Sequence, residues 1–105
     1  MLLETKLILL GAYLTHGTAT DGTQRDGFYK ELALRNSITH RLAAEFGEEF
    51  LDLQKIFDEA CEMFPPEHWT QDGTHPTAAG HRLIANAWEK KMQPTLMTAE
   101  KKMEF

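Results

Sequence analysis

The sequence predicts a single α/β domain in which parallel strands are flanked by helices. Residues 5–14, "TKLILLGAYL", form a nearly continuous apolar run, which is typical of a strand buried on both faces of a sheet. Periodicity alone also allows a short buried helix there. Residues 24–46 repeat apolar side chains at helical spacing, and residues 48–54, "EEFLDLQ", predict a second strand. Strands that alternate with helices imply right-handed crossover connections.

The helix over residues 24–46 is predicted to be amphipathic and to end at Gly47. Its apolar positions are Phe28, Leu32, Ile38, Leu42 and Phe46. Residues 55–64, "KIFDEACEMF", predict a short helix that Pro65 and Pro66 end.

The last helix is predicted to begin at Pro76, because a proline in the first helical turn loses no hydrogen bond. Pro94 is predicted to end this helix. Its apolar stripe consists of Leu83, Ile84, Ala87, Trp88 and Met92. Residues 1–94 are therefore assigned to the folded portion and residues 95–105 to a solvated tail.

The chain has 105 residues, enough for one domain with a small core. Two strands leave unpaired backbone groups at a sheet edge, and such an edge normally recruits another strand. We therefore expect self-association, either a homodimer or larger assembly in which residues 5–14 pair across chains, or a domain swap.

The charge distribution excludes one class of partner. Residues 48–75 carry eight acidic side chains and one lysine, and no segment forms the basic stripe that nucleic acid requires. The apolar run "LILLGAYL" is too short to span a membrane. Cys61 is the only cysteine, so no internal disulfide can form, and a cytoplasmic location fits best.

An acid and an imidazole stand three residues apart in "TQDGTHPTAAGHRLIANAW", residues 70–88. Asp72 and Gly73 form a turn, so that Asp72 is predicted to curl back toward the ring of His75 at the mouth of the last helix. A carboxylate bonded to one ring nitrogen fixes the tautomer of the imidazole. Such a histidine is suited to taking a proton from a nucleophile and returning it to a leaving group.

Residues 69–88, "WTQDGTHPTAAGHRLIANAW", resemble the last motif block of the SGNH (GDSL-type) hydrolases, a family of flavodoxin-like serine esterases and acylhydrolases. Upstream, "KLILLGAYL" resembles the penultimate core strand, "RNSITHRLAAEFG" the long helix, and "EEFLDLQKIFDEA" the last strand and following short helix. The resemblance covers roughly residues 5–92, but only the second half of the family domain. It implies a partial flavodoxin-like, three-layer α/β fold.

The resemblance implies carboxylic ester hydrolysis without a cofactor, with His75 as the catalytic base and Asp72 as its orienting acid. Trp69 is implied as a wall of the substrate cleft, and core packing is the alternative for this side chain. The family's Gly-Asp-Ser nucleophile block and oxyanion residues have no counterpart here. Ser37, the only serine, lies in a predicted helix and not on the strand-to-helix turn that exposes a nucleophile.

Three functions therefore remain open. The chain supplies the acid–base pair of an ester hydrolase whose serine lies elsewhere, or it is an inactive structural or oligomerising module, or other chemistry reuses the pair. A metal site is not expected, because His75 and His81 are six residues apart and would lie on different faces of a helix. Cys61 is expected to be an inert packing thiol, because no cation is placed near it. His16, His40 and His68 have no partner at a recognisable spacing and are expected at the surface.

Overall fold

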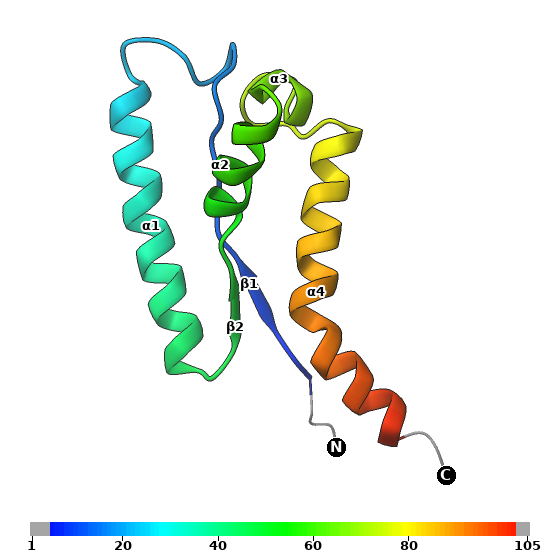
Figure 1. Cartoon of the computed structure of the whole chain (residues 1–105). Coiled ribbons are helices and arrows are strands. Elements are labelled where there is room, and N and C mark those ends of the chain that lie inside the picture. Colours follow the sequence, from blue (N-terminus) through cyan, green and yellow to red (C-terminus); the bar gives the residue numbers. More distant parts are fainter. Residues whose placement is uncertain (1–4, 103–105) are drawn as a thin grey trace.

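The computed structural model describes residues 5–102, with side chains through residue 98. Two parallel strands, β1 (Ile8–Leu10) and β2 (Glu49–Leu51), pair with Ile8 opposite Glu49 and Leu10 opposite Leu51. Helix α1 (Arg25–Glu45) connects them, as the 24–46 periodicity predicts. Figure 1 shows the strands between α1 on one side and α4 on the other, which is a partial three-layer α/β fold.

The predicted strand over residues 5–14 is correct in type but pairs with β2 only over three residues. Beyond it the chain stays extended because side-chain amides replace a neighbouring strand. Asn36 accepts from the Ala12 N–H (2.9 Å) and donates to the Ala12 carbonyl (2.8 Å). Gln54 does the same for Leu14, at 2.8 and 2.9 Å. Two amide clamps thus guide the chain from β1 to the loop that follows it.

The core lies between β2, α2 (Leu53–Met63) and α4 (Ala78–Lys102). Its buried members are Leu51, Leu53 and Phe57, and further apolar side chains pack against them: Ile8, Tyr13, Ile56, Trp69, Leu83, Ile84 and Ala87. Asp52 caps α2 by accepting from the Lys55 N–H (3.2 Å). This helix begins two residues earlier than predicted and ends before Pro65, as predicted.

The apolar face predicted for α1 does not point into the core. Phe28, Ile38, Leu42 and Phe46 are between 42 and 75% exposed, and Ala43 is the buried residue of this helix. The reason is the width of the sheet: two strands offer too little surface to cover an apolar stripe on a 21-residue helix.

Two predicted boundaries of the last helix are wrong. Pro76 forms an antiparallel bridge with Thr70 instead of starting α4, and Thr77 caps the helix by accepting from the Gly80 N–H (3.2 Å). Pro94 does not end α4, which continues to Lys102. Figure 1 shows that α4 bends in its second half, as a proline that removes one helical hydrogen bond allows. Residues 103–105 of the predicted tail lie outside the described residues.

A four-residue helix, α3 (Pro66–Trp69), was not predicted. Pro66 occupies its first turn, where a proline is favoured. A Cβ added to Gly80 would overlap the carbonyl oxygen of Trp69, so glycine lets α4 approach α3 closely. This contact fixes both ends of the loop that carries Asp72 and His75. Within residues 5–102 no helix is long and apolar enough to cross a membrane.

Candidate active site

Asp72 and His75 lie in a closed loop between α3 and α4. The Gln71 N–H donates to the His75 carbonyl (2.8 Å), and the Thr77 N–H donates to the Trp69 carbonyl (3.0 Å). Gly73 turns the chain with a φ of 105°, a conformation that favours glycine. The loop therefore presents the two predicted side chains on one short, hydrogen-bonded turn.

The contact predicted between the two side chains is present. Asp72 Oδ2 lies 2.7 Å from His75 Nδ1, and the other carboxylate oxygen accepts from the backbone N–H groups of Thr74 and His75, each at 2.9 Å. These donors, the His75 N–H foremost and then the Thr74 N–H, hold the pKa of Asp72 well below its usual value. Asp72 therefore remains a carboxylate over the whole pH range in which a catalytic histidine can act.

The outer nitrogen of the imidazole is available to a substrate. Nδ1 of His75 is occupied by Asp72, and the side chain of His75 is 76% exposed, whereas that of Asp72 is 27% exposed. Because α4 begins at Ala78, His75 precedes the first turn of the helix instead of lying in it.

The loop after β1 packs against the loop that carries Asp72 and His75 and is hydrogen-bonded to its backbone. The Ala19 N–H donates to the Asp72 carbonyl (2.8 Å), and the Thr15 N–H donates to the Gly73 carbonyl (2.9 Å). Gly17 lies against the backbone of Asp72 so closely that a Cβ there would overlap it. The sequence marks this segment only as a Gly- and Thr-rich loop, so its role was not predicted.

Buried threonine hydroxyls complete the brace. Thr15 and Thr70 are 4% and 1% exposed, and their Oγ1 atoms lie 2.8 Å apart. Thr70 Oγ1 accepts from the Gly73 N–H (2.9 Å), and Thr15 Oγ1 donates to the Gly73 carbonyl (3.2 Å). Both backbone groups of Gly73 are thereby tied to buried side chains, which fixes the residue next to Asp72.

Tyr13 links the core to the candidate site. Its ring stacks on Phe57, with centroids 4.0 Å apart and planes 8° apart, and its hydroxyl donates to the Thr74 carbonyl (2.7 Å). Burial, and then the charge of Asp72, raise the pKa of Tyr13, so the phenol keeps the proton it donates. Tyr13 was not among the predicted site residues, because nothing in its local sequence distinguishes it from a core residue.

Trp69 precedes the loop at the end of α3. Its indole N–H points to the carbonyls of Ala60 (3.0 Å) and Phe64 (3.2 Å) at the end of α2, and its ring packs against the core. The packing role considered for Trp69 is therefore present. The role as a cleft wall stays a prediction.

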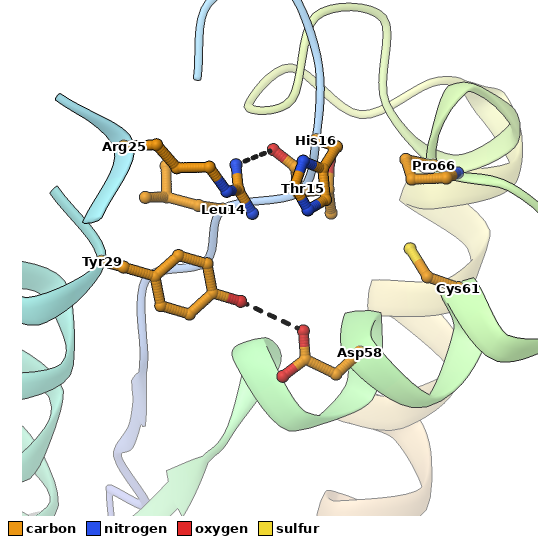
Figure 2. A pocket seen from close by; sticks show the side chains of 8 residues that line it. All are labelled: Leu14, Thr15, His16, Arg25, Tyr29, Asp58, Cys61 and Pro66. Atoms are coloured by element: carbon orange, nitrogen blue, oxygen red, sulfur yellow. Dashed lines mark hydrogen bonds between the residues drawn. The ribbon is translucent and has the colours of Figure 1, made fainter. Parts of the chain in front are cut away.

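A pocket of about 160 Å³ lies on the other side of Thr15, between α1 and α2 (Figure 2). Arg25 donates to the Thr15 carbonyl (3.3 Å) and the Tyr29 hydroxyl donates to Asp58 (3.4 Å), so two pairs of its lining residues are bonded to each other. Burial, followed by the charges of Asp58 and Glu67, raises the pKa of the Cys61 thiol in its wall. Cys61 is therefore held as a thiol, as predicted. Asp72 and His75 do not line this pocket.

Three other predictions concern polar side chains. His16 has a partner after all, since its Nδ1 lies 2.9 Å from Asp21, although both side chains are exposed. Ser37 donates to the carbonyl of Leu34 in its own helix (2.7 Å), so its hydroxyl is engaged within α1. In the part of the chain whose side chains are described, no three His, Cys, Asp or Glu side chains gather as metal ligands would.

Known proteins are similar to this chain in sequence and in fold. An acetylxylan esterase from Geobacillus stearothermophilus is 26% identical over 92 residues, which cover 88% of this chain and 42% of the esterase. A protein described as a GDSL-like lipase from Parabacteroides merdae superposes with a TM-score of 0.72 and 26% identity over 81% of this chain and 38% of its own. This chain resembles the C-terminal half of an SGNH (GDSL-type) hydrolase.

An α/β hydrolase from the metagenome of Lake Arreo, Spain, is also similar, with a TM-score of 0.67 and 27% identity over 81% of this chain and 37% of its own. No family model matches the chain. The chain spans about two fifths of the length of these relatives.

Solved variants of the acetylxylan esterase share the fold, with 22 or 23% identity to this chain. Those described as catalytic mutants replace an aspartate, or a histidine three positions later, with alanine, and another replaces a serine close to the start of that chain. The aspartate and histidine have the spacing of Asp72 and His75. A further variant replaces the tryptophan directly before that aspartate, where this chain has Gln71 and carries Trp69 two residues earlier.

Proposed function

We propose that this chain carries the acid–base pair of a carboxylic ester hydrolase, with His75 as general base and Asp72 as the residue that orients it. The contact of 2.7 Å between Asp72 Oδ2 and His75 Nδ1 carries the proposal, because it leaves Nε2 of an exposed ring toward solvent. The aspartate–histidine spacing of the catalytic mutants of the acetylxylan esterase supports it.

In this proposal a serine hydroxyl from a polypeptide segment outside this chain attacks the ester carbonyl. Nε2 of His75 takes the hydroxyl proton and returns it to the departing alcohol, while the carboxylate of Asp72 stabilises the imidazolium. Trp69 is proposed to border the ester site. Acetylated carbohydrate is the first substrate to try, because a relative is named for acetylxylan.

The chain alone is proposed to have little or no serine esterase activity. Ser37 is engaged within α1, and within residues 5–98 we identify no serine on a strand-to-helix turn. A serine-reactive phosphonate should leave the chain unlabelled, and an aryl acetate should be hydrolysed no faster than by free imidazole. Labelling that disappears in a Ser37→Ala variant would contradict this assignment.

The acid–base role is tested in a chimera. Residues 5–102 would replace the matching segment of the acetylxylan esterase, and turnover of an aryl acetate would be measured in chimeras whose far-UV circular dichroism shows a folded protein. We expect turnover that falls by about 10³-fold or more with His75→Ala and less with Asp72→Asn. His81→Ala, on the exposed face of α4, is the matched control. Equal turnover with and without His75 would exclude the role.

The alternative is an inactive structural or oligomerising module. The exposed apolar residues of α1 favour it, since they suit a protein interface better than a free surface. A chimera that folds but never turns over ester would support this alternative.

A cytoplasmic location is also proposed, because a single cysteine gives the chain no internal disulfide. Fractionation of cells that express the natural protein would test it.

A further inference from the structure

The hydroxyl of Thr74 lies between the two members of the acid–base pair. Its Oγ1 atom is 3.0 Å from Oδ1 of Asp72 and 3.1 Å from Nδ1 of His75. Nδ1 itself lies 2.7 Å from Oδ2 of Asp72, so the carboxylate, the hydroxyl and the imidazole form a closed triangle of three contacts. A single hydroxyl thus contacts both the acid and the base.

The direction of each hydrogen bond follows from the protons that these groups carry. Asp72 is a carboxylate and can only accept, so the short contact to Oδ2 requires a proton on Nδ1 of His75. A protonated Nδ1 cannot accept from Thr74. The hydroxyl therefore donates to Oδ1 of Asp72 and turns a lone pair toward the Nδ1–H group, which then has two acceptors on the same side of the ring.

The same hydroxyl helps to fix the rotation of the carboxylate. Oδ1 of Asp72 accepts from three groups: the N–H groups of Thr74 and His75, each at 2.9 Å, and the Thr74 hydroxyl. With Oδ1 occupied in this way, Oδ2 is the oxygen that faces the imidazole.

Thr74 is held in place by the core, whereas the ring that it contacts is not. The Thr74 carbonyl accepts from the hydroxyl of Tyr13 (2.7 Å), whose ring stacks on the fully buried Phe57. A β-branched side chain has few rotamers, so a fixed backbone leaves the Thr74 hydroxyl few directions. The side chain of His75, by contrast, is 76% exposed.

A single exposed ion pair would hold such a ring weakly, because water competes for both partners. Hydrogen bonds that share their donors and acceptors strengthen one another. The nitrogen that carries the proton in a neutral imidazole is set by the hydrogen bonds that the ring makes, and a general base needs Nε2 without a proton. A second acceptor on Nδ1–H favours that form.

We propose that Thr74 is a positioning residue, whose hydroxyl holds the imidazole of His75 in the Nδ1–H tautomer with Nε2 free. The catalytic consequence of this role rests on the proposed function, whereas the tautomer is a property of the chain alone. His16 provides a comparison within the molecule. Its Nδ1 lies 2.9 Å from Asp21, and within residues 5–98 no hydroxyl is bonded to that pair.

NMR of the histidine ring nitrogens in the chain alone, at alkaline pH where imidazole is neutral, tests the proposal. In the wild type we expect His75 to carry its proton on Nδ1. Thr74→Ala and Thr74→Val should each lower the ratio of the Nδ1–H to the Nε2–H form by about two- to tenfold, the equilibrium effect of one hydrogen bond. Valine puts a methyl group where the hydroxyl was and alanine leaves the place empty, so an effect common to both reports the lost hydroxyl and not crowding.

Thr74→Ser is the matched control, because it keeps the hydroxyl and should restore most of the ratio. The ratio at His16 should be the same in all four proteins. An unchanged ratio at His75 in the alanine and valine variants, or an equal loss in Thr74→Ser, would overturn the positioning role. A wild-type His75 that carries its proton on Nε2 would overturn it equally.

The catalytic consequence is measured in the esterase chimera. Thr74→Ala and Thr74→Val should lower kcat for an aryl acetate and leave KM unchanged, and Thr74→Ser should restore kcat. An unchanged kcat in a chimera that requires His75 would overturn the catalytic consequence. Turnover that does not require His75 would overturn the proposed function, while the NMR result would still decide whether Thr74 positions the ring.

Discussion

The carboxylate of Asp72 is bound by the two residues that close its own turn, Thr74 and His75. This explains why the acid–base contact could be predicted from the sequence: every atom involved lies within four residues. The brace behind it could not be predicted, because Thr15 meets Thr70 across 55 positions of the chain. Local spacing says nothing about such a contact.

The depressed pKa of Asp72 predicts a pH dependence of stability. Because the folded-state pKa lies below the ordinary 3.8, ionised Asp72 stabilises the fold at higher pH, and this stabilisation is lost as the pH falls below about 3.8. We therefore expect the wild type to exceed Asp72→Asn in free energy of unfolding at neutral pH, and the difference to shrink below about pH 4. Urea unfolding at a series of pH values measures this; a constant difference down to pH 2 would refute it.

Thr70→Val removes the hydroxyl at the centre of the brace. The Gly73 N–H then loses its partner in a buried place, which costs about 1–3 kcal/mol. Thr98→Val, on exposed α4, is the control and should change stability by no more than about 0.5 kcal/mol. Equal effects in thermal unfolding of the two variants would mean that the Thr70 hydroxyl contributes nothing.

At the scale of elements, the apolar pattern predicted the order of strands and helices correctly. It did not predict several of the residues at which these elements begin or end. The helix over residues 24–46 was predicted within one residue at each end, because Gly47 and the periodicity mark it. The strand predicted over residues 48–54 begins within one residue of β2 but ends three residues too late, because Asp52 caps α2 there. The start of α4 was misplaced because Pro76 suits a helical first turn and a bridge equally well. The end was misplaced because a proline bends a helix without always ending it.

The amide clamps on the segment after β1 differ in environment, which predicts an order of effects. Gln54 binds a half-buried Leu14 and also Tyr29 and Asp58, whereas Asn36 binds an exposed Ala12 whose backbone water can reach. Gln54→Ala should therefore cost about 1–3 kcal/mol, and Asn36→Ala about 1 kcal/mol or less. Chemical denaturation compares the two, and the reverse order would contradict the role of burial.

The whole molecule has one well-covered side. Phe57 is fully buried between β2, α2 and α4, whereas the apolar residues of α1 lie on the surface. The sequence predicted α1 as a core-facing helix because an apolar stripe does not specify what covers it. The sequence therefore predicted the layers of the fold, but not that the apolar face of α1 would be left uncovered.

This asymmetry predicts opposite outcomes for two phenylalanines. Phe57→Ala should cost about 3–5 kcal/mol, because it removes a buried ring and the stacking partner of Tyr13. Phe46→Ala, 75% exposed, should change the stability of the isolated monomer by no more than about 0.5 kcal/mol. Unfolding measured at submicromolar concentration separates the two, and a large loss at Phe46 would show that α1 is buried in the monomer.

The contact of Gly17 with the backbone of Asp72 bears on the transfer of residues 5–102 from one protein to another during evolution. Both halves of the clasp, the turn after the first strand and the turn before the last helix, belong to the same stretch of chain. A protein that acquired residues 5–102 would thus acquire the Asp72–His75 contact already formed, and would need to contribute both the attacking group and the donors that bind the oxyanion.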